Sequence, residues 1–253
     1  MDPIIFSKLI ELEKTNNVRV LYACESGSRA WGFPSPDSDY DVRFIYLHDI
    51  DWYLSLRDRK NTIDLPVSGD LDLGGWELKK ALQLLRKSNP PLLEWLFSPI
   101  VYTSNAAFLT DLKELAKMFF SPVAVMHHYL SMSKKYHELC LEGENIRLKR
   151  YFYALRTAIA GKWVKETLTV PTTEMQNMYS ILDQKLTEKI NELINIKSSQ
   201  KEDYLHPREP MIDSFLSQTI RENEEAAPGL PASKGDIGLL DDFYRKTVKG
   251  AFA

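Results

Sequence analysis

The fold is decided by residues 20–47, which read VLYACESGSRAWGFPSPDSDYDVRFIYL. Two apolar runs, 18–24 and 42–47, have the composition of buried strands. Between them a Glu-Ser-Gly-Ser turn contains Gly27 and Ser28, whose small side chains let the backbone approach a ligand closely. The stretch therefore predicts a strand, a turn that can bind phosphate, a loop and a second strand.

Two carboxylates open the second strand. Asp39 and Asp41 are separated by one residue, so alternation along a strand directs both to one face and Tyr40 to the other. Two like charges directed at one place repel each other unless a cation lies between them. Mg²⁺ takes oxygen ligands and is commonly held by one or two carboxylates plus substrate phosphates. The pattern therefore predicts a magnesium site beside the phosphate turn.

Each half of this pattern is common by itself. Gly-Ser occurs in many turns, and Asp-x-Asp at the head of a strand is more often an exposed pair at a loop edge. The two halves in this order, separated by a loop with glycine and prolines, favour a site for metal and nucleotide. The arrangement resembles the signature of the DNA polymerase beta-like nucleotidyltransferase superfamily, in which Gly-Ser is followed by a strand with two metal-binding carboxylates.

That superfamily completes its metal site with a third carboxylate on a neighbouring strand, and two residues compete for this role. Asp72 alternates with Leu71 and Leu73, and we place it at the end of a strand that runs directly into a Gly-Gly turn and a helix over 76–87. Asp64 is also an acid between aliphatic neighbours. The position before the Gly-Gly turn favours Asp72 and leaves Asp64 as the alternative.

Composition limits the classes of function. A chain of 253 residues fits one large domain or two small ones. Its net charge of −3, with 26% charged residues, indicates no extended DNA-binding surface. The two cysteines match no metal spacing and are expected to be reduced core thiols. Neither a signal peptide nor a run of 18 apolar residues is evident, which predicts a cytoplasmic protein with no membrane partner.

The periodicity predicts an α/β (α+β) fold in which a sheet domain is followed by a helical domain. We place the catalytic sheet domain at 1–104, with an amphipathic helix near its start that packs on the back face of the sheet. The helical domain, at 105–253, ends in a linker and a final helix. Its first long helices are expected over 122–142 and 144–168, around Gly143.

On the second of these helices Lys149, Tyr153 and Arg156 form a stripe beside the apolar face. A lysine and an arginine that flank a tyrosine can hold phosphates and stack a base. A solvated helix face explains the same stripe, and on the pattern alone it is the slightly better explanation.

Three phrases narrow the resemblance to one family: SGSRAWGFPSPDSDYDVRFIY, LDLGGWELKKALQLLRKSNPPLLEWLFSPIVY and KRYFYALRTAIAGKW. They are similar to a bacterial family of predicted nucleotidyltransferases, the RNA-repair-pathway DNA polymerase beta family (RlaP or YcgL type), over roughly 21–163. The chain shows no departure at Gly27, Ser28, Asp39 or Asp41. The resemblance also favours a nucleotide-binding role for the stripe.

The resemblance implies a nucleotidyltransferase with a two-metal mechanism. A nucleoside triphosphate, ATP among them, would place its phosphates on the Gly-Ser turn, with two Mg²⁺ ions, or Mn²⁺ in their place, on the three carboxylates. An acceptor hydroxyl would attack the α-phosphorus, and pyrophosphate would leave. Arg29 and Lys149 are candidates for stabilising the pyrophosphate side.

The acceptor stays open at this point: an RNA end, a small molecule and a protein hydroxyl all fit, and the sequence does not name the base. Two other classes of function also remain. One is a nucleotide-binding module without catalysis, which the presence of three carboxylates disfavours. The other is a toxin–antitoxin component that nucleotidylates a protein, which shares the chemistry and differs in the acceptor.

Overall fold

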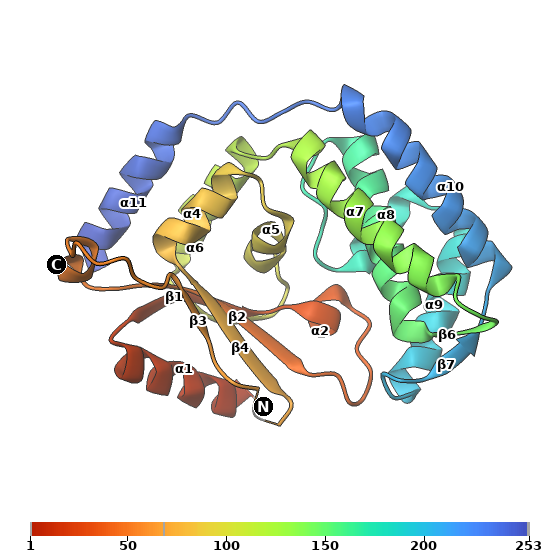
Figure 1. The fold of residues 1–253 in the computed structure, drawn as a ribbon, viewed down its shortest axis with the longest axis horizontal. Helices are drawn as coiled ribbons and strands as arrows, with labels where there is room; N and C mark the ends of the chain where they lie inside the picture. The colour runs from red at the N-terminus through yellow and green to blue at the C-terminus, as the bar shows by residue number, and fades with distance from the viewer. Residues whose placement is uncertain (1, 68, 252–253) are drawn as a thin grey trace. The chain divides into compact units, whose positions relative to one another are not determined.

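The computed structural model describes residues 2–67 and 69–251. The chain divides into two compact units (Figure 1), each made of segments that are separate in the sequence. The sheet unit comprises Met1–Gly27, Asp39–Phe119 and Lys234–Ala253, and the helical unit comprises Ser28–Ser38 and Phe120–Ser233.

The sheet unit is built on one mixed sheet with the strand order β3-β4-β2-β1-β5. Within it β2 runs parallel to β4, and the other neighbouring pairs are antiparallel. This confirms the predicted α/β class. The strands are β1 (Arg19–Glu25), β2 (Tyr40–Leu47), β3 (Thr62–Asp64), β4 (Leu71–Glu77) and β5 (Val101–Ser104).

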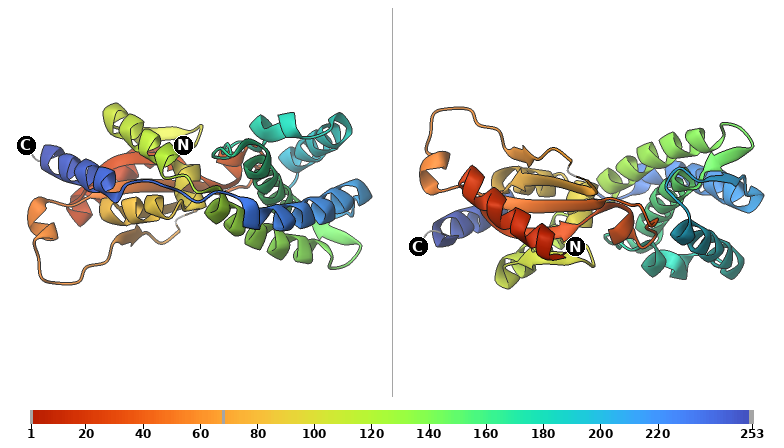
Figure 2. Two further views of the ribbon diagram at one scale, coloured as in Figure 1. Left: turned by 90° about the horizontal axis from the view of Figure 1, so that it is seen from above. Right: turned by 90° about the horizontal axis from the view of Figure 1, so that it is seen from below.

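Helix α1 (Asp2–Asn16) covers one face of this sheet (Figure 2), as the amphipathic pattern predicted. Its Ile5, Leu9 and Leu12 are buried in one core cluster with Val42 and Phe44 of β2. Apolar residues three to four apart form one helix face, and alternate residues of a strand form one sheet face. The odd-numbered residues at the start of β2 are therefore directed away from α1.

The opposite face of the sheet carries further helices of the same unit. Helix α4 buries Leu78, Ala81, Leu82 and Leu85, the face that its periodicity predicted. The helices on this face are α4 (Leu78–Arg86), α5 (Pro90–Leu96), α6 (Ala106–Met118) and α11 (Ile237–Ala251). The short helix α3 (Ile50–Tyr53) follows β2 and buries no residue.

The Gly-Gly pair does not form the predicted turn. Gly74 and Gly75 lie inside β4, and a Cβ atom on Gly75 would stand 2.2 Å from the ring of Phe44. Gly75 is therefore explained by close packing of that ring against the strand. Asp72 consequently lies at the start of its strand and not at the end, and helix α4 begins later than predicted, at Leu78.

The helical unit is dominated by two consecutive helices that pack against each other, α7 (Pro122–Cys140) and α8 (Leu148–Thr167). Two short strands pair with each other, β6 (Asn145–Arg147) and β7 (Leu205–Pro207). The helix predicted over 144–168 therefore begins later, at Leu148, because the residues before it belong to β6. The unit also contains α9 (Gln184–Ser199), α10 (Pro210–Ala226) and the 3₁₀ turns η1 (Met175–Ile181) and η2 (Ala227–Gly229). The short helix α2 (Gly27–Trp31) starts at the last residue of one sheet-unit segment.

The division into units differs from the predicted boundary at 104/105. Helices α6 and α11 belong to the sheet unit, where Phe108 and Phe243 pack with ring centroids 5.5 Å apart. The segment Ser28–Ser38 belongs to the helical unit, where Phe33 stacks on Phe152 of α8 at 4.9 Å. Both assignments include an aromatic contact between segments that are distant in the sequence, and no local pattern predicts such contacts.

Both cysteines are buried free thiols, as predicted. Burial raises the pKa of Cys24 and of Cys140 to about 12, so both stay protonated at neutral pH. Among the described helices, none has the length and apolar character that crossing a bilayer requires.

Candidate active site

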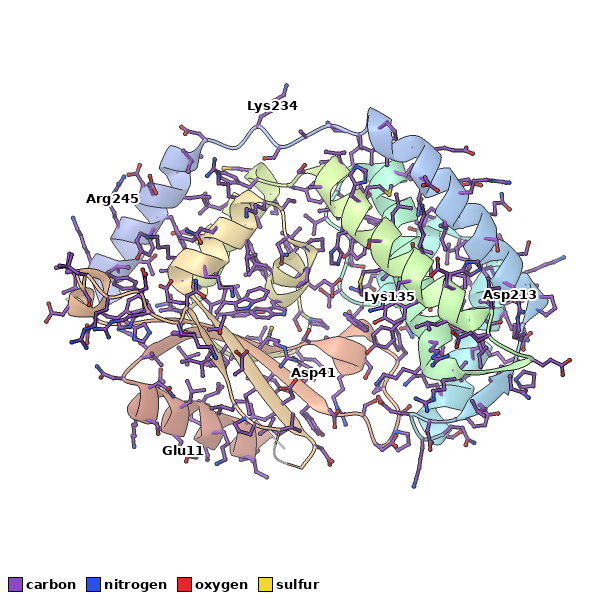
Figure 3. The ribbon with its side chains drawn as sticks, in the orientation of Figure 1. Glu11, Asp41, Lys135, Asp213, Lys234 and Arg245 are labelled. Atoms are coloured by element: carbon purple, nitrogen blue, oxygen red, sulfur yellow. The ribbon has the colours of Figure 1, made fainter. Side chains whose placement is uncertain are left out.

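The central carboxylates lie on neighbouring parallel strands. The register of β2 and β4 sets Asp41 directly opposite Asp72, and Figure 3 labels Asp41 on β2. Asp64 lies on the edge strand β3, opposite Gly74, where its carboxylate accepts a hydrogen bond from the Thr62 hydroxyl. The register therefore brings Asp72, and not Asp64, beside Asp41.

The third predicted ligand, Asp39, is exposed and precedes β2 by one residue. Tyr40, which follows it, packs against the core cluster shared with α1, as predicted. Because side chains alternate between the two faces of a strand, the side chain of Asp39 is expected on the same face as that of Asp41.

Arg43 joins the two central carboxylates, and sequence reasoning missed it. Its Nη2 atom lies 3.1 Å from Oδ1 of Asp41 and 2.7 Å from Oδ2 of Asp72, while its Nη1 donates to the backbone carbonyls of Val42 and Asp72. The guanidinium thus neutralises part of the charge that two adjacent carboxylates create. Its position two residues after Asp41, on the same strand face, was the signal available in the sequence.

Position 27 must be a glycine because the backbone there lies against the side chain of Asp41. Its φ of +62° is a conformation that side chains disfavour, and a Cβ atom there would stand 2.0 Å from Oδ2 of Asp41. The neighbouring Ser26 amide donates to the Asp41 carbonyl at 2.9 Å. The segment after β1 is therefore fixed on β2, and a glycine is needed to admit the aspartate side chain.

Glu25 is a second residue that sequence reasoning missed. Its side chain is completely buried, and its Oε1 accepts a hydrogen bond of 2.8 Å from the Asp41 amide. Its Oε2 accepts a hydrogen bond from the Tyr102 hydroxyl of β5. A buried carboxylate in this place fixes the backbone of Asp41 in relation to two other strands.

The donor chemistry of this cluster fits Mg²⁺. Asp39, Asp41 and Asp72 offer carboxylate oxygens, the ligands that Mg²⁺ prefers. Within residues 2–67 and 69–251 no three acidic, histidine or cysteine side chains form a metal-ligand group. The cation that lies between Asp41 and Asp72 is the Arg43 guanidinium. Asp39, Asp41 and Asp72 are the residues that would hold a metal, and Arg43 would compete with it for Oδ1 of Asp41 and Oδ2 of Asp72.

The predicted phosphate-turn residues Ser28 and Arg29 belong to the helical unit. The Ser28 hydroxyl is buried and donates to Oγ of Ser38 at 3.1 Å, and Ser38 in turn donates to Oε1 of Glu202 at 3.0 Å. Arg29 donates from Nη2 to the Ser38 carbonyl at 2.7 Å. The Ser28 hydroxyl therefore has an internal partner in this structure, and a phosphate at this turn would have to compete with Ser38 for it.

The three residues of the predicted stripe on α8 do not share one environment: Arg156 is buried, whereas Lys149 and Tyr153 are partly exposed. Arg156 is only 2% exposed, its guanidinium lies 4.6 Å from the ring of Trp31, and it donates to the Thr173 carbonyl. It is therefore an internal residue and not part of a surface that could meet a ligand. Tyr153 is half-buried against Trp31, with ring centroids 5.1 Å apart, and Lys149 pairs with Glu202.

Lys149 and Tyr153 instead line a pocket of about 390 Å³ in the helical unit. Three basic residues and two tyrosines contribute to its wall, together with two acids. The complete lining is Tyr136, Leu139, Arg147, Lys149, Arg150, Tyr153, Glu202 and Asp203.

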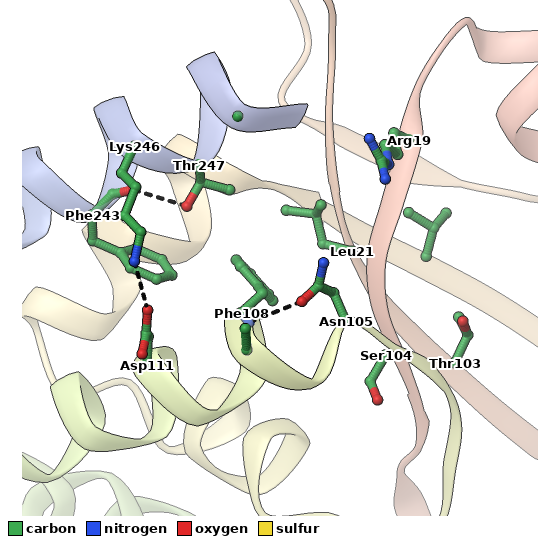
Figure 4. A pocket seen from close by; sticks show the side chains of 13 residues that line it. Arg19, Leu21, Thr103, Ser104, Asn105, Phe108, Asp111, Phe243, Lys246 and Thr247 are labelled. Atoms are coloured by element: carbon green, nitrogen blue, oxygen red, sulfur yellow. Dashed lines mark hydrogen bonds and ion pairs between the residues drawn. The ribbon is translucent and has the colours of Figure 1, made fainter. Parts of the chain in front are cut away.

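A second cavity, of about 500 Å³, lies at the start of β1, the end of this strand that is remote from Glu25 and the carboxylate cluster (Figure 4). Its lining includes Arg19, and with a rise of about 3.3 Å per residue that end of the strand is about 20 Å from Glu25. The polar groups around it already have structural partners: Asn105 caps α6 through the Phe108 amide, and Lys246 pairs with Asp111. This cavity is therefore separate from the carboxylate cluster.

A family model described as the RNA repair pathway DNA polymerase beta family (RlaP) matches residues 1–246. The uncharacterized protein YcgL of Bacillus subtilis (strain 168) is 39% identical over 235 residues, which cover 92% of this chain and 90% of that protein. A crystal structure of a nucleotidyltransferase-like protein from Exiguobacterium sibiricum 255-15 aligns with 99% of this chain and 80% of its own, at a TM-score of 0.33 and 12% identity. The assignment of a family rests on the first two matches.

Proposed function

This chain belongs to the RNA repair pathway DNA polymerase beta family, and from that membership we propose that it is a Mg²⁺-dependent nucleotidyltransferase. It would move a nucleoside monophosphate from a nucleoside triphosphate to an acceptor hydroxyl and release pyrophosphate. The family description makes an RNA end the first acceptor to test. Because both cysteines are free thiols, we expect the protein to act in a reducing compartment, the cytoplasm.

The observation that carries this proposal is the pairing of Asp41 with Asp72 across parallel strands. Two acids in register on adjacent strands repel each other, and such an arrangement is stable only with a compensating cation. In this chain the cation is Arg43, a group that a metal ion can replace because the arginine side chain is about one-fifth exposed. A purely structural role for the two aspartates does not require this partly open position.

Asp39, Asp41 and Asp72 would hold the metal ions through their carboxylate oxygens. When bound, Mg²⁺ lowers the pKa of an acceptor hydroxyl and neutralises charge on the attacking and leaving oxygens. Glu25 fixes the backbone of Asp41, and Gly27 leaves room for its side chain. Glu25 therefore acts by positioning a ligand and not by contact with substrate, whereas Gly27 both makes room for the Asp41 side chain and belongs to the proposed phosphate turn.

The triphosphate would bind at the Gly27-Ser28 step of the chain, which the family resemblance assigns to phosphate. Arg29 supplies a positive charge next to this step, and its present bond to a backbone carbonyl is one that phosphate oxygens can replace. Lys149 and Tyr153 keep their proposed role in nucleotide binding as part of the basic and aromatic pocket.

A nucleotide-binding module without catalysis is the second candidate, and one specific observation favours it. Arg43 already satisfies the charges of Asp41 and Asp72, so the cluster is stable without a metal. In that case the protein would bind nucleotide, and neither Mg²⁺ nor Mn²⁺ would promote turnover.

Pyrophosphate release separates the two candidates. The purified protein is incubated with each nucleoside triphosphate and a 3′-hydroxyl RNA, with Mg²⁺, with Mn²⁺ and with EDTA. Metal-dependent release supports the transferase. Nucleotide binding in a thermal-shift assay without release, under every metal and acceptor, supports the module.

The acceptor is then identified by incubating cell extract with labelled nucleoside triphosphate and analysing the labelled product by mass spectrometry. A labelled RNA end supports a role in RNA repair. A labelled protein in its place would assign the chain to protein nucleotidylation.

A further inference from the structure

We infer that the pocket between α7, α8 and the segment after α9 is a binding site for one nucleotide unit, with a phosphate on its arginines and a base on its tyrosines. This inference rests on the proposed function, and it adds the place on the helical unit at which a nucleotide binds. It also replaces part of the stripe predicted from the sequence, because Arg156 is internal whereas Arg147 and Arg150 line this pocket.

The charges of the pocket suit a phosphate. Lys149 is paired with Glu202, and Arg150 donates to the Leu139 carbonyl and to Glu142. Arg147 is exposed at the start of α8, and its backbone pairs with Leu205 of β7. Within the described part of the chain its guanidinium makes no hydrogen bond or ion pair. A guanidinium in this state can bind a phosphate with two parallel hydrogen bonds and without first breaking an internal ion pair.

The aromatic wall suits a base. Tyr136 of α7 and Tyr153 of α8 lie with ring centroids 4.9 Å apart and planes inclined by 52°, and both rings are half-buried. The Nζ atom of Lys149 lies 5.9 Å from the Tyr153 ring. Partly open tyrosine rings with cations beside them are the elements with which proteins bind single nucleotides by stacking. The volume of about 390 Å³ is within the usual range of small-ligand sites.

A chain of hydrogen bonds connects this pocket with the predicted phosphate turn inside the helical unit. Glu202 accepts from Lys149 through Oε2 and from Ser38 through Oε1, and Ser38 accepts from the Ser28 hydroxyl. Trp31 of the same segment packs against Tyr153. A phosphate that draws Lys149 away from Glu202 would therefore loosen the hydrogen bond that fixes Ser38, and through it the position of Ser28.

The nucleotide unit can come from the incoming triphosphate or from the end of a single-stranded nucleic acid, and binding measurements distinguish these sources. The probes are a fluorescent ATP analogue and a fluorescein-labelled six-nucleotide single strand, made as RNA and as DNA. Anisotropy is measured in EDTA, so that no transfer takes place during the titration. The variants are Arg147→Ala and Tyr136→Leu, and the control is Arg221→Ala, which removes an exposed arginine of α10 outside the pocket.

We expect the dissociation constant of at least one probe to rise about tenfold in Arg147→Ala and in Tyr136→Leu, and to stay unchanged in Arg221→Ala. A response of the oligonucleotide alone assigns the pocket to the acceptor strand, and a response of the ATP analogue alone assigns it to the incoming nucleotide. Unchanged affinity for every probe, or an equal loss in the Arg221→Ala control, overturns the inference.

Pyrophosphate release by the same proteins keeps this result separate from the proposed function. If wild-type protein releases pyrophosphate and the pocket variants bind every probe normally, the transferase proposal stands and the pocket inference is wrong. If no condition gives release while the pocket variants lose affinity, the pocket binds nucleotide in a protein without transferase activity. Circular dichroism of Tyr136→Leu and Arg147→Ala verifies that both variants are folded.

Discussion

The carboxylate cluster of the sheet unit and two buried cations of the helical unit hold their charges in opposite ways. In the sheet unit Asp41, Arg43 and Asp72 meet on one sheet face and stay between one-fifth and about one-third exposed. In the helical unit Arg156 and Lys197 are each only 2% exposed and bond to backbone or hydroxyl oxygens. Charges of the first kind can exchange a protein partner for a ligand, whereas those of the second kind cannot do so without disturbing the fold.

The largest expected effect is on catalysis, at the carboxylates. Asp41→Asn and Asp72→Asn should each lower metal-dependent pyrophosphate release by about 100-fold or more, because each removes a charged metal ligand. Stability should change by about 1 kcal/mol or less, since these ion pairs are partly exposed. Asp64→Asn is the matched control and should keep normal turnover; a loss equal to that of Asp72→Asn would assign the third ligand to Asp64.

The next effect is on stability, at the buried arginine of the helical unit. Arg156→Ala should lower the free energy of unfolding by about 2–4 kcal/mol, because it removes buried hydrogen bonds and the contact with Trp31. Urea denaturation measures this, with Arg221→Ala as a surface control expected to change stability by about 0.5 kcal/mol or less. If Arg156→Ala is as stable as the control, the side chain is not internal in solution.

Gly27 tests how closely the chain approaches Asp41. Gly27→Ala should lower the free energy of unfolding by about 1–3 kcal/mol, through its positive φ and the clash with the aspartate. Gly32→Ala is the control, because Gly32 also has a positive φ, of +90°, but a Cβ atom at this position would meet nothing within 4 Å. The difference between the two variants in chemical denaturation isolates the contact with Asp41, and equal losses would show that the contact is absent.

Arg43 tests whether a guanidinium and a metal ion compete for one place. In Arg43→Met the two carboxylates lose their cation, so Mg²⁺ or Mn²⁺ should raise the melting temperature more than in the wild-type protein. Differential scanning fluorimetry with a titration of each metal measures the shift, and Arg57→Met, at an exposed site of the same unit, is the control. A metal-induced shift no larger than that of wild type would mean that Arg43 and the metal do not share these carboxylates.

The smallest expected effect is a pH dependence in the helical unit. Burial lowers the pKa of Lys197 from 10.5 to about 8, against the opposing charge of Glu202. Between these two values the unfolded chain binds more protons than the folded one, so stability should rise with pH from about 8 upward. Urea unfolding between pH 7 and 9.5 should show this rise in wild type and a flatter profile in Lys197→Met.

Lys185→Met, at an exposed site of the same helix, is the control for this measurement and should behave as wild type. A rise in Lys197→Met as steep as in wild type would assign the pH dependence to another group.

The sequence correctly predicted the features that depend on the periodicity of side chains along a single strand or helix. Alternation along β2 was enough to direct Tyr40 to the core, and helical spacing was enough to assign the buried faces of α1 and α4. The resemblance to the family, confirmed by the match over residues 1–246, named the chemistry to look for. The prediction of a turn at Gly74-Gly75 was wrong because glycine favours turns, whereas here both residues lie inside a strand and Gly75 admits the ring of Phe44.

What the sequence by itself determined is which side chains share a face, because that follows from the 2.0- and 3.6-residue periods of the backbone. Only the tertiary structure decided which faces meet. The parallel register of β2 and β4 set Asp72, and not Asp64, opposite Asp41 and placed Arg43 between the two carboxylates. The packing of Trp31 and Phe33 on α8 buried Arg156 and left Lys149 and Tyr153 at a pocket. Contacts between segments more than 100 residues apart depend on the fit of side chains, and no local period encodes them.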